Sequence, residues 1–136
     1  MTLVRVEAPV HPTESVAKVK LACRAVFPDL AFKEEGDLLV GETATLDHFR
    51  EILRKQRIRD TAREVLIRGR QDGRTSFTLN KQAAYVGVVN FGALRAPLGD
   101  IHVTIEEEDL DGLIDRVAES TVGRRLTGSR GRSEGR

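Results

Sequence analysis

The sequence predicts an α+β fold: a two-layer sandwich of a mostly antiparallel sheet with helices on one face. Several short segments alternate apolar and polar residues, as half-buried strands do. Other segments place apolar residues three or four positions apart, as helices packed along one stripe do. Strands of the alternating kind have one wet face, so the helices are expected to cover the other.

The first strand and helix are clear in the pattern. Residues 3–10, "LVRVEAPV", alternate and predict a strand. Pro12 disfavours its continuation, and Thr13 is a good N-cap for a helix that begins at Glu14 and runs to about Ala25. The buried stripe of that helix is Val16, Val19, Cys23 and Val26.

Next comes a predicted hairpin. Residues 30–35 and 37–44 are short strand-like runs, and Gly36 and Asp37 between them favour a tight turn. Thr45 is placed to cap the following helix, whose buried stripe is Leu46, Phe49, Ile52 and Leu53.

The phase of the apolar stripe then breaks, which predicts a second helix or a sharp kink. Ile58, Ala62, Val65 and Leu66 form a stripe out of register with the first. Thr61 and Glu64 have the spacing of a capping box, so the new helix is expected to begin near Asp60 or Thr61.

Two more strands, two loops and a last helix are predicted over residues 69–118. Residues 69–74 predict a loop, 75–80 a strand, 91–100 a loop with glycines and a proline, and 101–107 another alternating strand. An amphipathic helix is predicted over 109–118. We expect one domain over 1–122, followed by a basic Gly/Ser/Arg tail over 123–136 that cannot bury enough surface to fold.

The composition indicates a cytoplasmic protein with an aliphatic core. Aromatic residues make up only 4% of the chain. The single cysteine, Cys23, lies among apolar residues, which favours a packed and inert thiol. No apolar run reaches the roughly 20 residues that a membrane span needs, and a signal peptide is not expected.

The usual catalytic and metal-binding patterns are not found. His11, His48 and His102 are far apart, and neither HExxH nor CxxC spacing occurs. There is no GxSxG motif and no phosphate-binding glycine loop, and the carboxylates of 106–111 suit a helix N-terminus. We therefore expect no metal, no cofactor and no enzymatic activity.

Charge is distributed unevenly along the chain. The net charge is +1, but residues 50–81 carry +6 and residues 82–122 carry −6. Arg50, Arg54 and Arg57 share one helix face by their spacing, and Arg59 and Arg63 repeat it. Such a line of guanidinium groups suits a nucleic-acid backbone. The alternative is a solvated helix face with ion pairs to Glu51, Asp60 and Glu64.

The stretch "NKQAAY" follows the strand over 75–80. Asn80 can cap a short helical turn, with Lys81 and Gln82 solvated, which is the structural interpretation. The functional one is that the amides read base edges, that Lys81 holds a phosphate and that Tyr85 stacks on an unpaired base.

Four stretches, "HPTESVAKVK", "LRKQRIRDTAREVL", "FTLNKQAAYVGVVNF" and "APLGDIHVTI", span most of residues 3–121. Together they resemble a family of small archaeal proteins of uncharacterised role, classed as an RNA-binding domain. The fold of that family is similar to that of ribosomal large-subunit protein five, an α+β sandwich that contacts ribosomal RNA. The resemblance implies that architecture and RNA as a partner here.

Matched residue by residue, the motifs "LRKQRIRDTAR" and "LNKQAA" imply roles for Gln56, Asp60 and Thr61 and for the predicted contact residues. We expect RNA contacts from Arg54, Lys55, Arg57, Arg59, Arg63, Asn80, Lys81 and Gln82. Lys81 is also expected to lie near the arginines of 54–63 and to extend their surface.

Three functional hypotheses follow. The first is a non-catalytic protein that binds the RNA backbone through a basic helical face. The second is an interaction or assembly module whose basic surface meets an acidic protein partner. The third is an enzyme of unrecognised class that uses Asp60, Lys81 or a histidine, which a deep pocket around these residues would support.

Overall fold

The protein is a six-stranded antiparallel sheet covered by helices. The computed structural model describes residues 2–91 and 100–119, and within them the strand order is β2-β3-β1-β6-β5-β4. Every strand pair is antiparallel. The strands are β1 Leu3–Pro9, β2 Ala31–Glu35, β3 Leu38–Thr43, β4 Arg70–Gln71, β5 Arg74–Asn80 and β6 Asp100–Glu106.

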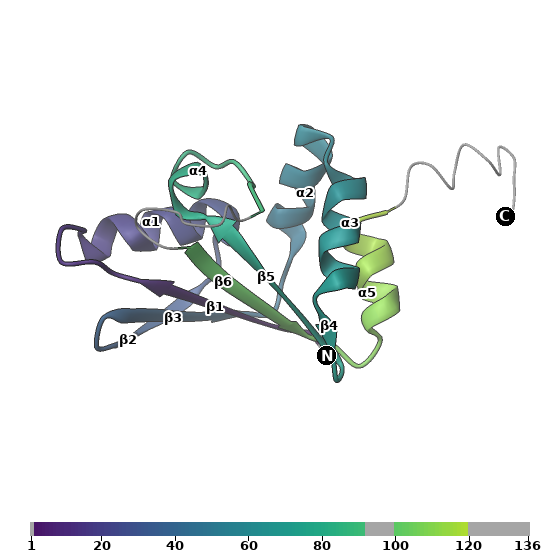
Figure 1. Cartoon of the computed structure of the whole chain (residues 1–136), viewed down its shortest axis with the longest axis horizontal. Coiled ribbons are helices and arrows are strands. Elements are labelled where there is room, and N and C mark those ends of the chain that lie inside the picture. The colour runs from purple at the N-terminus through teal and green to yellow at the C-terminus, as the bar shows by residue number, and fades with distance from the viewer. Residues whose placement is uncertain (1, 92–99, 120–136) are drawn as a thin grey trace, which may run out of the picture.

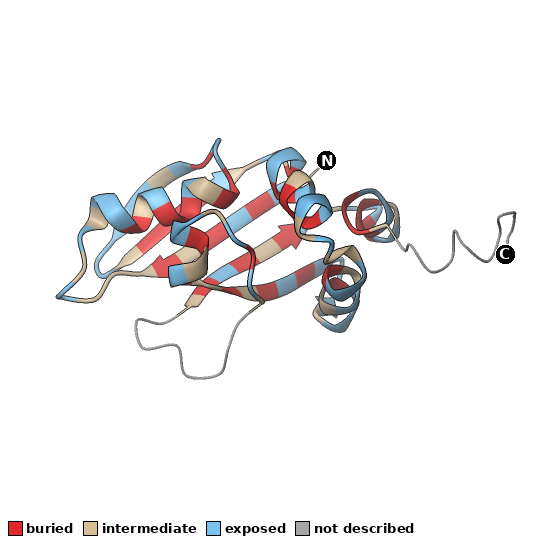
Figure 2. Cartoon of the chain, turned by 90° about the horizontal axis from the view of Figure 1, so that it is seen from above, coloured by how far each residue is buried: buried red, intermediate tan, exposed pale blue. Residues whose placement is uncertain are grey.

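The helices lie in two groups on one face of the sheet (Figure 1). They are α1 Val16–Val26, α2 Asp47–Gln56, α3 Arg59–Arg68, α4 Lys81–Tyr85 and α5 Leu110–Val117. Figure 2 shows α1 and α4 over one half of the sheet and the other three helices at its opposite end. The predicted α+β sandwich is confirmed, while the likeness to ribosomal protein five stays a prediction.

Alternation along the strands builds the core. Val4, Val6 and Ala8 of β1 are fully buried, whereas Arg5 between them is exposed on the uncovered face. Val4 pairs with Ile105 and Val6 with Val103, so the buried residues of neighbouring strands stand side by side under the helices (Figure 2). This register fixes which face of the sheet the helices must cover.

A chain of aromatic contacts ties the two helix groups together. The ring centroids of Phe27 and Phe49 lie 5.4 Å apart, and those of Phe49 and Phe77 lie 5.6 Å apart. Phe91 then meets Phe77 edge to face at 5.7 Å. Since Phe27 ends α1, Phe49 belongs to α2 and Phe77 to β5, these three rings lie where helices and sheet converge.

The predicted break between two helices is confirmed at Arg57. Its backbone is left-handed, with φ of 59°, and its amide donates to the carbonyl of Arg54. The chain turns there, and α3 begins at Arg59 with Ile58 as its N-cap. The expected start at Asp60 or Thr61 was therefore one or two residues late, because no side chain caps this helix.

Three other boundaries differ from the sequence predictions. The N-cap of α2 is Leu46 and not Thr45. Ser15, not Thr13, caps the first helix: its hydroxyl accepts a hydrogen bond from the amide of Lys18. The loop predicted over 69–74 contains β4, which pairs with β5 around a turn at Asp72 and Gly73. Most of the loop predicted over 91–100 and the whole tail over 123–136 lie outside the described residues.

We expect Gly69→Ala to destabilise the protein. A Cβ at Gly69 would press directly against the backbone carbonyl oxygen of Ser76, whose amide donates to the carbonyl of Gly69 at 3.2 Å. Backbone cannot yield as a side chain can, so we expect the free energy of unfolding to fall by roughly 1–3 kcal/mol in urea denaturation. Ser76→Ala, an exposed change at the same contact, is the control; equal losses in both variants would contradict the steric cause.

Candidate nucleic-acid interface

Arginines of the basic segment pair with carboxylates along α5. Arg63 Nη1 lies 2.7 Å from Asp115, and Arg59 Nη1 lies 3.5 Å from Glu119. Arg70, just beyond α3, lies 2.7 Å from Asp111. Asp111 and Asp115 are four residues apart and so project from one side of α5 toward the basic segment, and Glu119 follows just after the helix ends. The charge excess of residues 50–81 is thus partly neutralised within the fold.

This pairing changes how Arg59 and Arg63 are interpreted. Arg63 also donates to the backbone carbonyl of Ala118 at 3.3 Å, so it fastens α3 to the end of α5. Residues 50–81 therefore carry less unpaired positive charge than their own sequence indicates, because carboxylates of residues 111–119 compensate part of it. The carboxylates remain largely exposed, so each pair contributes little to stability.

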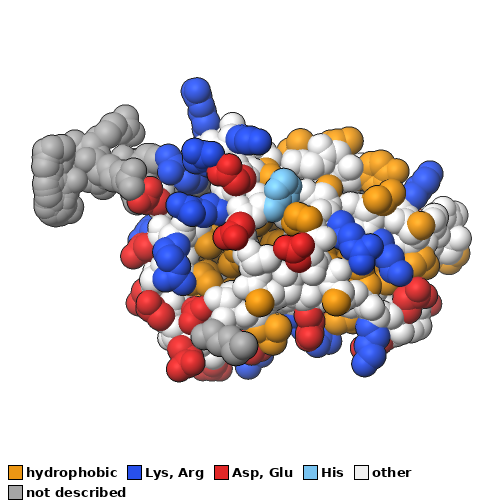
Figure 3. Space-filling model, turned by 180° about the vertical axis from the view of Figure 1, so that it is seen from behind, with side chains coloured by type: hydrophobic (Ala, Val, Ile, Leu, Met, Phe, Trp, Pro, Cys, Tyr) orange, Lys and Arg blue, Asp and Glu red, His pale blue; other side chains and the backbone are white. Residues whose placement is uncertain are grey.

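The end of α2 is where basic side chains remain exposed. Arg54 is exposed and lies 2.7 Å from Glu51 of its own helix. Lys55 and Arg57 are exposed as well, and neither has an ion-pair partner within the described part of the chain. Figure 3 shows Lys and Arg side chains gathered at the end of the molecule that carries α2 and α3, with Asp and Glu side chains nearby.

A groove between α2, α3 and α5 brings four arginines together. A cavity of about 280 Å³ is lined by Arg50, Arg54, Arg59 and Arg116, with Glu51 and Glu119 beside them. An adjoining cavity of about 200 Å³ shares Arg50 and Arg116. We call these four residues the arginine groove. With Glu51 and Glu119 of the first cavity and Asp47 of the second, the charged side chains around the groove sum to +1, which suits an anionic ligand.

Arg116 is a residue of the groove that was not predicted from the sequence. It stands in a segment of −6, far from the basic stretch in the sequence. Only the packing of α5 against α2 and α3 places it beside Arg50. Its position at the end of the amphipathic helix, outside the apolar stripe, was the one available signal.

Gln56 has a structural role within the basic motif. Its Nε2 donates to the carbonyl of Val89 at 3.0 Å, and the Val89 amide donates to its Oε1 at 2.7 Å. The side chain therefore behaves like a strand partner for the buried Val89. It holds the end of α2 against the segment that follows α4.

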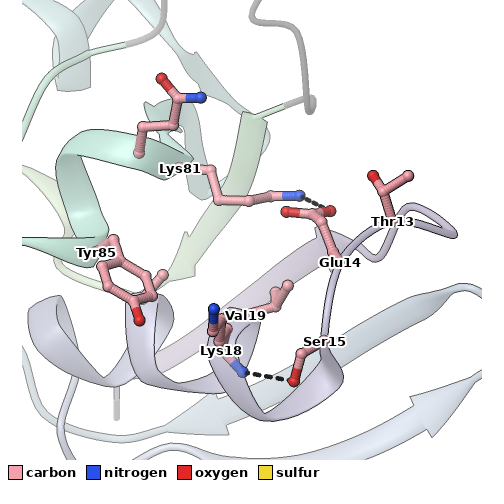
Figure 4. Close-up of a pocket in the computed structure, with 9 residues that line it drawn as sticks. Thr13, Glu14, Ser15, Lys18, Val19, Lys81 and Tyr85 are labelled. Carbon is pink, nitrogen blue, oxygen red and sulfur yellow. Dashed lines mark hydrogen bonds and ion pairs between the residues drawn. The ribbon is translucent and has the colours of Figure 1, made fainter.

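The "NKQ" stretch divides into a cap, a buried cation and an exposed amide. Asn80 caps α4: its Oδ1 accepts from the Ala83 amide at 2.8 Å, as predicted. Lys81 is only 5% exposed, and its Nζ donates to Pro9 O at 2.6 Å and to Glu14 Oε1 at 3.0 Å (Figure 4). Gln82 is exposed.

The interpretation of Lys81 as a solvated side chain is wrong. Its ammonium points to the start of α1, where Glu14 is itself largely buried, so it does not extend an exposed arginine surface. The sequence offered no sign of this contact, because Glu14 and Lys81 are 67 residues apart and meet only when α4 packs on α1.

Burial affects the pKa of two titratable groups, Glu14 and Cys23. Burial acts to raise the pKa of Glu14, but hydrogen bonds from the His11 amide and from Lys81, with the charge of Lys81, bring that pKa below its ordinary 4.5. Burial raises the pKa of the Cys23 thiol to about 12. Cys23 is therefore a packed, protonated side chain, as predicted.

The sequence of the chain is similar to those of a known protein family. Residues 3–107 match a family model described as RNA binding. The chain is 44% identical over 121 residues to a UPF0201 protein of Methanothermobacter thermautotrophicus, an alignment that covers 87% of this chain and 92% of the relative. The chain belongs to the UPF0201 family. The expected membership of an archaeal family classed as RNA-binding is confirmed.

Solved structures of the UPF0201 family share the fold. An uncharacterised UPF0201 protein superposes with a TM-score of 0.82 at 37% identity, covering 88% of this chain and 94% of that one. The UPF0201 protein of Methanococcus jannaschii gives 0.80 at 36% identity, with the same coverage. The described fold is thus the fold of the family.

The described residues contain neither a candidate metal-binding group nor a helix that could span a membrane. Among residues 2–91 and 100–119, the His, Cys, Asp and Glu side chains form no group of three that could hold a metal ion. No helix in this part of the chain is long and apolar enough to cross a bilayer.

We expect Glu14→Gln to destabilise the protein in a pH-dependent way. Above pH 4.5, the substitution removes the carboxylate that pairs with the buried Lys81 ammonium and lowers the free energy of unfolding by about 3 kcal/mol. Because the folded pKa of Glu14 is depressed, the wild-type advantage is full above 4.5 and is lost as the pH falls through the lower folded value.

Urea denaturation from pH 7 into the acid range measures this effect. Glu34→Gln is the matched control, since Glu34 pairs with Lys20 at 3.8 Å on an exposed surface and should change stability little. A gap between wild type and Glu14→Gln that stays constant as the pH falls below 4.5 would contradict the role of the ion pair.

Proposed function

We propose that this UPF0201 protein binds RNA through the phosphate backbone, using the arginine groove and the exposed end of α2. The observation that carries the proposal is the convergence of Arg50, Arg54, Arg59 and Arg116 from three helices on one pair of adjoining cavities. Guanidinium groups bind phosphate oxygens through paired hydrogen bonds and are weakly hydrated, so they suit this task.

Lys55 and Arg57 extend the proposed surface beyond the groove. Both are exposed at the end of α2, and Arg57 occupies the left-handed turn between α2 and α3. An RNA backbone that runs along the groove and past this turn would contact cations on two sides. Positions of this kind hold a polyanion in place without reading its sequence.

The carboxylates in the groove do not remove its attraction for phosphate. Glu51 and Glu119 orient Arg54 and Arg59, leaving the other N–H groups of each guanidinium for a ligand. Arg50 and Arg116 have no ion-pair partner in the described part of the chain. An RNA phosphate therefore meets a site that is ordered in advance and positive overall.

RNA is favoured over an acidic protein as the partner by the match of residues 3–107 to an RNA-binding family model. Of the eight contact residues predicted from the sequence, Arg54, Lys55, Arg57 and Arg59 stay in the proposed surface. Arg63 and Asn80 are proposed to act as structural supports, as is Lys81. Gln82 lies apart from the groove, next to α1.

Fluorescence anisotropy of single-stranded RNA across a salt series tests the proposal. We expect log affinity to fall linearly with log salt, and the triple variant Arg50→Ala/Arg54→Ala/Arg116→Ala to reduce the magnitude of the slope by about 2, at roughly 0.7 per lost contact. The affinity at low salt should fall at least tenfold.

A charge-matched control removes three exposed arginines elsewhere: Arg5→Ala/Arg68→Ala/Arg74→Ala. It lowers the net charge equally but leaves the groove intact, so its salt slope should stay close to that of the wild type. Equal losses in both triple variants, or binding that depends only on residues 123–136, would overturn the groove as the site. Absence of any salt-sensitive RNA binding would overturn the function.

A further inference from the structure

A cavity between α1 and α4 lies away from the arginine groove. Its volume is about 490 Å³, within the range of small-ligand pockets. Val19 and Ala22 of α1, both nearly fully buried, contribute an apolar floor. Polar groups of Ser15, Lys18 and Gln82 stand around it.

An aromatic ring forms one wall of this cavity. Tyr85 is 47% exposed, although it belongs to a helix that packs closely on α1. Figure 4 shows it extending from α4 over α1, on the side where Lys18 lies. An exposed ring beside an apolar floor offers a stacking surface to a flat ligand.

The charge of the cavity favours an anionic ligand. Glu14 is engaged by Lys81 at 3.0 Å, so its negative charge is compensated inside the protein. Lys18 is exposed, and no carboxylate of the described residues lies within ion-pairing distance of it. With Glu14, Lys18 and Lys81 counted together, the site carries +1, and the accessible charge is the ammonium of Lys18.

We propose that this cavity binds one unpaired nucleobase of single-stranded RNA, with its phosphate at Lys18. Tyr85 stacks on the base and the exposed amide of Gln82 hydrogen-bonds to its edge, while Val19 and Ala22 face its apolar surface. This proposal rests on the proposed RNA-binding function and adds that the RNA must be single-stranded at this point. A stacked base inside a duplex cannot enter the cavity.

The fold connects the base site to the arginine groove. Gln56 at the end of α2 is hydrogen-bonded to Val89, four residues after Tyr85. The position of α4, and with it Tyr85 and Gln82, is therefore fixed relative to the exposed cations at the end of α2. We propose that one RNA strand engages both sites, the backbone at the groove and a base at the cavity.

The composition of the chain allows a direct test. Tyr85 is its only tyrosine, so protein prepared with 3-fluorotyrosine gives a single ¹⁹F resonance from this site. We expect a short single-stranded RNA to shift that resonance, and the same oligonucleotide without bases, or a duplex of equal length, to leave it in place. Anisotropy on the same samples reports total binding.

Two variants complete the test. Tyr85→Leu keeps an apolar side chain but removes the ring, and we expect it to weaken binding of intact RNA about tenfold without affecting the base-free oligonucleotide. Val86→Ala, at a neighbouring residue that is 73% exposed, is the matched control and should leave both affinities unchanged. Lys18→Ala should weaken binding of both.

The outcomes separate the two proposals. RNA binding by anisotropy with a stationary fluorine resonance and an unchanged affinity of Tyr85→Leu would overturn the base site and leave the arginine groove standing. Failure of every RNA to bind would overturn both. A resonance that shifts equally with duplex and single-stranded RNA would contradict the insertion of an unpaired base.

Discussion

The structure depends on one constraint: a single face of a six-stranded sheet must be covered by five short helices. None of these helices is long enough to span the sheet alone, so they divide into two groups that meet the sheet through Phe27, Phe49 and Phe77. Wherever short helices meet one another, polar side chains must be satisfied at the junctions. Both candidate sites lie at such junctions, one between α1 and α4 and the other between α2, α3 and α5.

The same packing determines which charges face solvent. Folding brings the acidic α5 against the basic α3, so that Arg59 and Arg63 are held by carboxylates that are more than 50 residues away in the chain. In the other junction, Lys81 and Glu14 compensate each other in a buried ion pair. Among the cations of α2, the turn after it and α5, four stay exposed with no ion-pair partner in residues 2–91 and 100–119: Arg50, Lys55, Arg57 and Arg116. The proposed RNA surface combines these cations with Arg54 and Arg59, each of which is paired with one carboxylate.

Local patterns predicted the fold well because strands and helices here obey their periodicities. The alternation of Val4, Val6 and Ala8 identified the buried face, and the change of phase before Ile58 located the break between α2 and α3. The site was harder to predict. Charge counted along the chain could not show that α5 would cover α3, that Lys81 would be buried, or that Arg116 would join the arginines of α2. These features arise from contacts between distant segments, which periodicity and composition do not predict.

The central claim is that RNA meets the two helix junctions and not the uncovered face of the sheet. The most direct measurement is a titration of the ¹⁵N-labelled protein with a short single-stranded RNA, followed by amide chemical shifts. We expect the largest shifts at 54–57, around Arg116, and in α1 and α4 near Lys18 and Tyr85. Shifts concentrated on β1, β5 and β6, where Arg5 and Arg74 lie, or confined to residues 120–136, would contradict the claim.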